Sequence, residues 1–199
     1  MTDLVAELRR RPWILAIFLI VTGAIGWFAA FELIVGKFEL LENPKTDLAC
    51  DFSVLVQCGK NLDSWQGRVF GFPNPLIGLG GFVVPISVGV GLLAGARYAR
   101  WFWIAFNVGL AGALAFVIWL ISQSIYDLGT LCPWCMVVWM VTIPLFWSIT
   151  ARNLALGVYG ARLRRFGGML RTWVIPISIV CYAVIVLLAQ LELDALTRL

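Results

Sequence analysis

Five long apolar segments constrain this chain to a bundle of helices that cross a membrane. A hydrocarbon core of about 30 Å takes about 20 residues of α-helix to cross, and each segment is about that long. They cover residues 13–35, 76–96, 101–125, 132–151 and 172–191. Only 13% of the residues are charged, against about 25% in average proteins, so the chain cannot cover itself with a water-facing surface. The sequence predicts an all-α integral membrane protein.

The positively charged residues are distributed unevenly between the two sides of this predicted bundle. Residues 1–12, the second connection and the basic linker 152–171 share ten of the 15 Lys and Arg residues: Arg9, Arg10, Arg11, Arg97, Arg100, Arg152, Arg162, Arg164, Arg165 and Arg171. The long first loop 36–75, the third loop and the tail 192–199 hold the other five. Cytoplasmic connections carry the excess of Lys and Arg, which predicts a cytoplasmic N-terminus and an extracytoplasmic first loop. The net charge of +4 is then a topology signal, and no nucleic-acid partner is expected.

The chain contains no histidine, which removes the commonest general base, metal ligand and pH switch together. Ser-His hydrolases, His-ligated zinc sites and haem sites are therefore excluded. The chemistry that remains falls to five cysteines, at positions 50, 58, 132, 135 and 181. In the predicted topology the first four gather at the extracytoplasmic end, where disulfides form and persist.

The first cysteine pair, Cys50 and Cys58, lies in the long first loop. Apolar residues recur there at the spacing of an amphipathic helix on the membrane surface: Leu48, Phe52, Leu55 and Val56. A regular helix would hold the two cysteines about 12 Å apart along its axis, whereas a disulfide needs Cα atoms within about 7 Å. If the two pair, the helix must break between them. The pair is then either a mobile dithiol that carries electrons or a static disulfide that braces the loop.

The second pair, Cys132 and Cys135, opens the fourth segment as Cys-Pro-Trp-Cys. On a helix their Cα atoms lie about 5 Å apart, within the range of a disulfide. Pro133 suits the first helical position, and a helix N-terminus and a Cys-x-x-Cys motif both lower a thiol pKa. We therefore predict a reactive thiolate. Zinc is the alternative for four cysteines, but a site split between a helix and a Cys-x7-Cys loop has poor ligand spacing.

Two dithiols can pass a disulfide between them by exchange, but net oxidation needs a final electron acceptor. The sequence has no dinucleotide fingerprint and no haem or iron–sulfur spacing, so no metal and no flavin are expected. A lipid-soluble quinone is the acceptor that remains, because Cys135 lies one turn inside the membrane. Trp139 on the same helix face and Trp134 beside the pair are flat aromatic walls for its ring, although Trp139 is also explained as a packing residue.

Two further features have simpler readings. Three glycines near the start of the second segment, Gly78, Gly80 and Gly81, let helices pack closely or leave room for a flat ligand, and close packing is the favoured interpretation. Cys181 stands alone in the last segment and is expected to act as a small apolar residue.

The sequence resembles the vitamin K epoxide reductase family. The resemblance rests on the loop motif Cys-Asp-x6-Cys, on residues 64–73 with their Gly-Phe-Pro ending, and on the later Cys-x-x-Cys; it covers about residues 10–155. It implies a four-helix catalytic bundle, residues 13–151, around a quinone beside Cys135, with the fifth helix added to it. In that family the loop pair takes electrons from a thioredoxin-like protein and hands them to the position of Cys132. The resemblance also assigns Gly67 and Phe70 to the quinone site.

Bacterial members of that family have a DsbB-like function. They reoxidise a periplasmic thioredoxin-like protein of the DsbA type and reduce ubiquinone or menaquinone. The epoxide-reducing members act in the lumen of the endoplasmic reticulum, and they place a tyrosine where this chain has Trp139 and an asparagine where it has Gly67. These differences favour quinone reduction in a bacterial inner membrane over epoxide reduction. Because the sequence ends after the fifth segment, the thiol partner is expected to be a separate protein. A non-catalytic membrane adaptor with structural disulfides is the alternative from another class.

Overall fold

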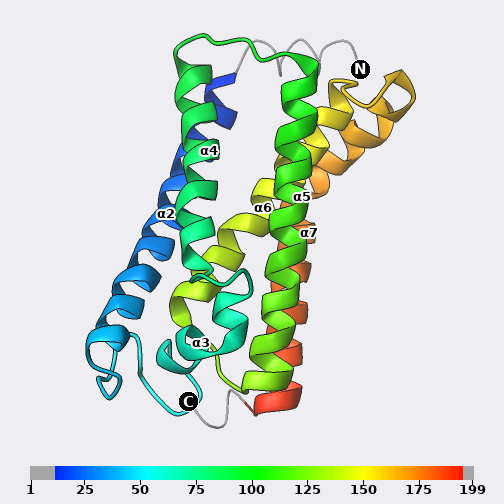
Figure 1. Cartoon of the computed structure of the whole chain (residues 1–199). Coiled ribbons are helices and arrows are strands. Elements are labelled where there is room, and N and C mark those ends of the chain that lie inside the picture. Colours follow the sequence, from blue (N-terminus) through cyan, green and yellow to red (C-terminus); the bar gives the residue numbers. More distant parts are fainter. Residues whose placement is uncertain (1–11, 195–199) are drawn as a thin grey trace.

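The structure is a computed structural model that describes residues 12–194. These residues form helices and loops, with one isolated parallel β-bridge between Val56 and Leu131, so the predicted all-α class is confirmed. In chain order the elements are α2 (Pro12–Glu42), α3 (Gly59–Asp63), η1 (Trp65–Arg68), α4 (Pro75–Leu93), α5 (Arg100–Ser122), η2 (Gln123–Leu128), α6 (Pro133–Ala155), η3 (Ala161–Leu163) and α7 (Arg164–Leu193) (Figure 1). Five of these helices, α2, α4, α5, α6 and α7, are long and apolar enough to cross a membrane.

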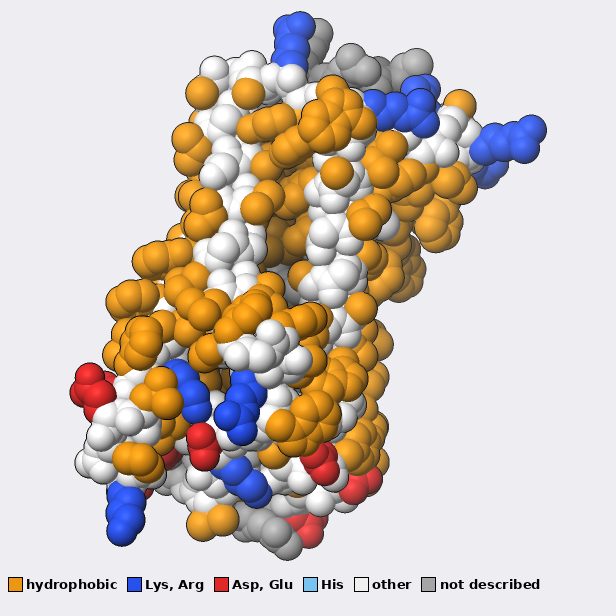
Figure 2. All heavy atoms as spheres, viewed as in Figure 1, with side chains coloured by type: hydrophobic (Ala, Val, Ile, Leu, Met, Phe, Trp, Pro, Cys, Tyr) orange, Lys and Arg blue, Asp and Glu red, His pale blue; other side chains and the backbone are white. Residues whose placement is uncertain are grey.

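The long helices run between two ends of the molecule that differ in charge. One end, here called the cysteine end, carries α3, η1, η2 and the start of α6, and the acidic side chains visible in Figure 2 gather there. The other end, here called the basic end, carries the connections from α4 to α5 and from α6 to α7, where arginines cluster (Figure 2). Arg9, Arg10, Arg11 and Arg198, which were counted for the predicted topology, lie outside the described residues.

The core of the bundle forms where α2 packs against α4 and α6. Its buried side chains include Leu19, Leu145 and Ile149. Glycine is required where α2 and α4 cross, because a Cβ at Gly89 would lie 2.6 Å from the carbonyl oxygen of Ala16. Close backbone approach through small residues is the usual way for helices to associate in lipid.

The first helix extends well beyond its predicted end at residue 35, as far as Glu42. A lysine lies within this extension, since Lys37 is only 8% exposed. Its Nζ lies 3.2 Å from Oδ1 of Asp63, at the end of α3. A charged residue inside the helix is therefore neutralised by a partner from the loop, and the helix does not have to stop before it.

The fifth long helix, α7, also begins before its predicted start at residue 172, at Arg164. Three arginines assigned to the basic linker, Arg164, Arg165 and Arg171, consequently lie on the helix. Its far end reaches the cysteine end, where Ala189 and Leu193 pack in one apolar cluster with Leu55, Leu131 and Trp139. The fifth helix thus covers part of the region that holds the cysteines.

Candidate redox site

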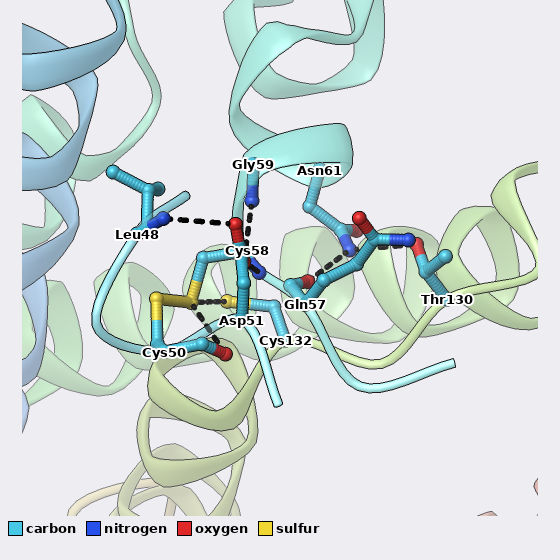
Figure 3. Close-up of a disulfide and its surroundings, with 9 residues drawn as sticks. All are labelled: Leu48, Cys50, Asp51, Gln57, Cys58, Gly59, Asn61, Thr130 and Cys132. Carbon is cyan, nitrogen blue, oxygen red and sulfur yellow. Dashed lines mark hydrogen bonds between the residues drawn. A yellow bond between two sulfur atoms is a disulfide. The ribbon is translucent and has the colours of Figure 1, made fainter. Parts of the chain in front are cut away.

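Cys50 and Cys58 form a disulfide, with their Cα atoms 5.8 Å apart (Figure 3). The surface helix expected over residues 48–56 does not form, because the chain reverses between Phe52 and Val56. There the N–H of Phe52 donates to the carbonyl of Val56 over 2.9 Å. This turn supplies the break that pairing of the two cysteines requires.

The carboxylate of Asp51 holds the two arms of this loop together. Its Oδ1 accepts hydrogen bonds from the N–H groups of Cys58 (2.6 Å) and Gly59 (3.2 Å), and its Oδ2 accepts one from Leu48 (3.1 Å) (Figure 3). Hydrogen bonds to a charged acceptor are stronger than neutral ones. Asp51 therefore fixes the position of Cys58 through the backbone of that cysteine.

A short β-bridge joins this loop to the segment that precedes α6. The N–H of Leu131 donates to Leu55 O over 2.8 Å, and the N–H of Gln57 donates to Leu131 O over 3.0 Å. The residues that follow Gln57 and Leu131 are Cys58 and Cys132. The register of the bridge therefore brings one cysteine of each pair to the same place.

The sulfur atoms of Cys132 and Cys58 lie 3.4 Å apart, close enough for a weak thiol hydrogen bond (Figure 3). Both residues are fully buried, whereas Cys50 is partly exposed. Cys132 and Cys135 are thiols. The arrangement therefore places a thiol against one sulfur of a disulfide and leaves the other sulfur nearer to the surface.

Cys132 immediately precedes α6, whose first residue is Pro133, as the sequence predicts. Hydrogen bonding from the Cys135 thiol, and from backbone N–H groups at the start of the helix, lowers the pKa of the Cys132 thiol and outweighs its burial. A lowered pKa increases the thiolate fraction, and the thiolate is the nucleophile in disulfide exchange.

An apolar cavity of about 580 Å³ lies beside the second cysteine pair. Residues of α2, α4, α5 and α6 line it, and the surface is hollowed between α4 and α5 in the view of Figure 2. Its lining extends from Trp101 at the basic end to Cys135 at the cysteine end. Cavities of this size are typical of small-molecule sites, and the open side between two helices gives access from lipid.

Three of the residues assigned to a quinone from the sequence line this cavity, namely Cys135, Trp139 and Gly67. Two others are not among its lining residues. Trp134 is rotated toward α2, where its ring meets Phe28 edge-on at 5.7 Å between centroids. Phe70 is 58% exposed and packs against Phe72 and against Phe116, which itself lines the cavity.

A buried asparagine that the sequence did not single out, Asn74, also lines the cavity. The backbone N–H of Asn74 donates to Gly67 O over 2.8 Å. Asn74 therefore lies next to Gly67, the position at which the epoxide-reducing relatives have an asparagine. Its Nδ2 donates to Gln66 O over 2.6 Å, and its Oδ1 accepts from the N–H of Val69. The inference that Gly67 removes a polar group from this wall is therefore wrong, because a backbone contact brings Asn74 back to it.

A buried polar network at the cysteine end was also invisible in the sequence. Asn61 Nδ2 donates to Thr130 Oγ1 over 2.9 Å, and Asn61 Oδ1 accepts from Ser124 over 3.0 Å. Ser124 belongs to η2, a π-helical turn, a conformation found frequently at functional sites. Gly129, in the left-handed conformation with φ of 64°, ends that turn. No pattern in the sequence distinguishes a π-turn from the end of an ordinary helix.

The glycines of α4 divide between the two readings proposed for them. Gly78 and Gly81 line the cavity, and a Cβ at Gly78 would also lie 2.9 Å from the Cβ of Ala30 on α2. A Cβ at Gly80 would meet nothing within 4 Å. Room for a ligand therefore explains Gly81, and helix packing contributes at Gly78.

Metal binding does not explain the cysteine cluster. The described residues contain one group of potential ligands, Cys50, Asp51 and Cys58. Its two sulfur atoms are bonded to each other, and the Asp51 carboxylate already accepts three backbone N–H groups. The cluster is accounted for by the disulfide and its support.

Fold and site together define a multi-pass membrane protein that brings two cysteine pairs into contact beside an apolar cavity. Comparison with known families agrees with this description. The chain belongs to the vitamin K epoxide reductase family, whose sequence profile matches residues 17–150. Membership implies a thiol oxidoreductase linked to a quinone. A search of curated proteins finds no match to this chain.

Proposed function

We propose that this protein oxidises the dithiol of a thioredoxin-like partner and passes the electrons through its two cysteine pairs to a membrane quinone. The observation that carries this proposal is the 3.4 Å separation between the sulfur atoms of Cys58 and Cys132, next to a closed loop disulfide. This contact joins the pair in the loop to the pair in the membrane, as a relay requires.

The relay begins when a partner dithiol reduces the Cys50–Cys58 disulfide. Cys50 is the partly exposed member, so a partner thiolate attacks its sulfur, and the partner's second thiol completes the exchange. The partner leaves as a disulfide and the loop as a dithiol. Each exchange step transfers one sulfur–sulfur bond, so atoms and electrons balance.

The second exchange passes the electrons from the loop to Cys132 and Cys135. The thiolate of Cys58 attacks Cys132 of the Cys132–Cys135 disulfide, which forms a Cys58–Cys132 bond and releases the thiolate of Cys135. Cys50 then attacks Cys58, which restores the loop disulfide and releases Cys132. The structure has the loop disulfide closed and Cys132 and Cys135 as thiols, which corresponds to the state that follows this exchange.

The last step reduces the quinone. The Cys132–Cys135 dithiol gives up two electrons and two protons and closes to a disulfide, while the quinone becomes a quinol. The cavity supports this assignment because it combines a long apolar lining for an isoprenoid chain with Cys135 and Trp139 at one end. Ubiquinone and menaquinone both have a flat ring and such a chain.

The orientation that suits this function places the cysteine end outside the cytoplasm of a bacterial cell. The basic end would face the cytoplasm, in agreement with the excess of arginine there. Disulfides persist in the periplasm or a comparable compartment, so the partner would be a separate thioredoxin-like protein on that side.

The direct test is quinone reduction by the purified protein with a reduced thioredoxin-like donor, followed by quinone absorbance. The parent protein is expected to turn over, Cys135→Ala to lose activity, and the matched variant Cys181→Ser to retain it. Turnover by Cys135→Ala at the parent rate would contradict the mechanism. A disulfide pairing that stays fixed whatever donor or quinone is added would support the membrane adaptor instead.

Asn74 gives one specific reason to test a second substrate. An asparagine beside the quinone is a feature of the epoxide-reducing relatives, and Asn74 lines this cavity, whereas Trp139 offers no hydroxyl. The same assay with a quinone epoxide decides the matter, since formation of quinone from the epoxide would extend the activity.

A further inference from the structure

Two arginines from different helices lie on one short turn at the basic end. The turn follows α6 and covers residues 156–160. Arg100, the first residue of α5, donates from Nε to Val158 O over 2.7 Å. Arg164, the first residue of α7, lies over Gly157, since a Cβ at that glycine would be 3.1 Å from Cζ of the arginine. The turn therefore brings positive charge from α5 and α7 to one place.

A third arginine, Arg152, lies one helical turn earlier on α6, where its carbonyl accepts the N–H of Leu156 over 2.9 Å. Its Cζ lies 3.5 Å from the ring centre of Trp103, and its Nη1 donates to Oδ1 of Asn153 over 3.1 Å. A carbonyl, an aromatic ring, an amide and a glycine backbone thus hold the three arginines. All of these groups are neutral.

The part of the chain that forms this turn and its surroundings supplies no negative charge to these arginines. The sequence has no Asp or Glu in residues 64–126 or 128–191, and within residues 12–194 none of the three arginines forms an ion pair. Neither α5 nor α7 has an acidic residue in its first turn, and a helix N-terminus itself carries partial positive charge. An anion from outside the chain would therefore be attracted to the turn.

Exposed apolar side chains beside the arginines indicate what kind of anion this is. Trp101 follows Arg100 on α5, and Phe166 and Trp173 lie on the first turns of α7; all three are exposed. Both helices are long and apolar enough to cross a membrane, so their first residues lie near its surface, where tryptophan is enriched. A phospholipid offers a phosphate to the arginines and acyl chains to the aromatic rings, whereas a free anion offers only the first.

We propose that this turn and its arginines form a binding site for the phosphate of an anionic phospholipid. Val158 occupies only Nε of Arg100, which leaves both Nη groups for phosphate oxygens, and arginine binds phosphate through two parallel hydrogen bonds. The lipid would connect the first residues of α5 and α7 across the end of α6. This site lies at the end opposite the cysteines, and the proposal does not depend on the redox function.

The test is native mass spectrometry of the purified full chain in detergent with phosphatidylglycerol, with phosphatidylcholine of the same acyl chains, and with inorganic phosphate. The parent protein is expected to bind the first phosphatidylglycerol at least about tenfold more tightly than phosphatidylcholine. The double variant Arg100→Gln and Arg164→Gln should weaken phosphatidylglycerol binding by about tenfold to thirtyfold, since one arginine near an anionic surface is worth about fivefold. Its phosphatidylcholine binding should stay within about twofold.

Two control variants remove the same net charge elsewhere. Lys45→Gln with Arg68→Gln changes exposed residues at the cysteine end, and Arg97→Gln with Arg165→Gln changes exposed residues at the basic end. Both are expected to keep phosphatidylglycerol binding within about threefold of the parent protein. An equal loss in the Arg97 and Arg165 variant would mean that the whole end attracts lipid diffusely, and the assigned site would be wrong.

The parent protein alone decides the matter if the variant of Arg100 and Arg164 fails to fold. A parent protein that does not prefer phosphatidylglycerol to phosphatidylcholine contradicts the proposal. Binding of inorganic phosphate as tight as that of phosphatidylglycerol would make the occupant a free anion and would also contradict it.

Discussion

At the scale of single residues, a carboxylate decides which loop cysteine meets Cys132. Asp51 accepts the N–H of Cys58 over 2.6 Å, and this bond holds Cys58 beneath the loop and against Cys132. Cys50, on the other arm, stays partly exposed. The two cysteines of the loop are therefore not equivalent, although their positions in the sequence do not show which one faces inward.

A pair of double variants tests this assignment. With Cys50→Ala and Cys135→Ala, the remaining Cys58 and Cys132 are expected to form an intramolecular disulfide on mild oxidation at neutral pH, because their sulfur atoms lie 3.4 Å apart. With Cys58→Ala and Cys135→Ala, the disulfide between Cys50 and Cys132 should form much less. Peptide mass spectrometry without reduction measures both. More bonding in the second variant would reverse the proposed order of the relay.

Asp51→Asn tests the support of the loop. One oxygen becomes an NH₂ group that faces backbone donors, so at least one of three hydrogen bonds is lost at a cost of about 1–3 kcal/mol. The closed loop disulfide is expected to be roughly tenfold less favoured, since 1.4 kcal/mol is about tenfold. Titration with glutathione redox buffer measures this.

The control for that measurement is Asp47→Asn, on an exposed residue of the same loop. Its disulfide should titrate as in the parent protein. An unchanged midpoint in Asp51→Asn would mean that the loop closes without the carboxylate.

The sequence was sufficient to predict that four of the cysteines lie together but not which of them are in contact. Spacing and compartment identified two pairs and left Cys181 aside. The contact between Cys58 and Cys132 depends on a β-bridge at Val56 and Leu131, which joins distant segments and leaves no local pattern. Asn74 was missed for a similar reason, because a single backbone hydrogen bond to Gly67 O places it on the cavity wall.

At the scale of the helices, α4 uses its glycines for two different purposes. At Gly89 the helix touches the backbone of α2, so that a methyl group would overlap the carbonyl of Ala16. Gly81 lines the cavity instead. One face of α4 is thus packed against α2 and the other borders the space for a ligand.

Gly89→Ala should therefore separate α2 from α4. The added methyl group is expected to destabilise the bundle by about 1–3 kcal/mol through overpacking, and to lower the midpoint of thermal unfolding in detergent. Gly80→Ala is the matched control, because a Cβ at Gly80 meets nothing within 4 Å. Equal midpoints for the two variants would contradict the close contact.

Hydropathy predicted the number of long helices correctly, and it misplaced mainly the end of α2 and the start of α7. α2 continues past its predicted end because Asp63 neutralises Lys37, and α7 begins early because its first arginines lie at the basic end. A hydropathy pattern records where apolar residues stop, whereas a helix stops where its backbone loses hydrogen bonds. Charged residues at a membrane surface end an apolar pattern, but they do not end a helix whose backbone hydrogen bonds continue.

At the scale of the whole molecule, the relay and the charge pattern depend on the same orientation. The four paired cysteines pack in one cluster at the cysteine end. The connections from α4 to α5 and from α6 to α7 hold most of the described arginines at the basic end, and Arg68 of η1 is an exception at the cysteine end. A bundle inserted the opposite way would expose the loop disulfide to a reducing cytosol and would place the arginine excess on the outer side. The proposed chemistry and the charge pattern therefore favour the same orientation.

Two substitutions that each introduce one new cysteine test this orientation in intact cells. Lys45→Cys lies on the exposed part of the loop at the cysteine end, and Arg162→Cys lies on the exposed connection at the basic end. A membrane-impermeant maleimide should label Lys45→Cys before lysis and Arg162→Cys only after it, each measured against the parent protein. Both sites are exposed to water, so unequal labelling reports the side of the membrane and not burial. The reverse order would place the cysteine end in the cytoplasm, where the loop disulfide would be reduced and a disulfide-generating role would fail.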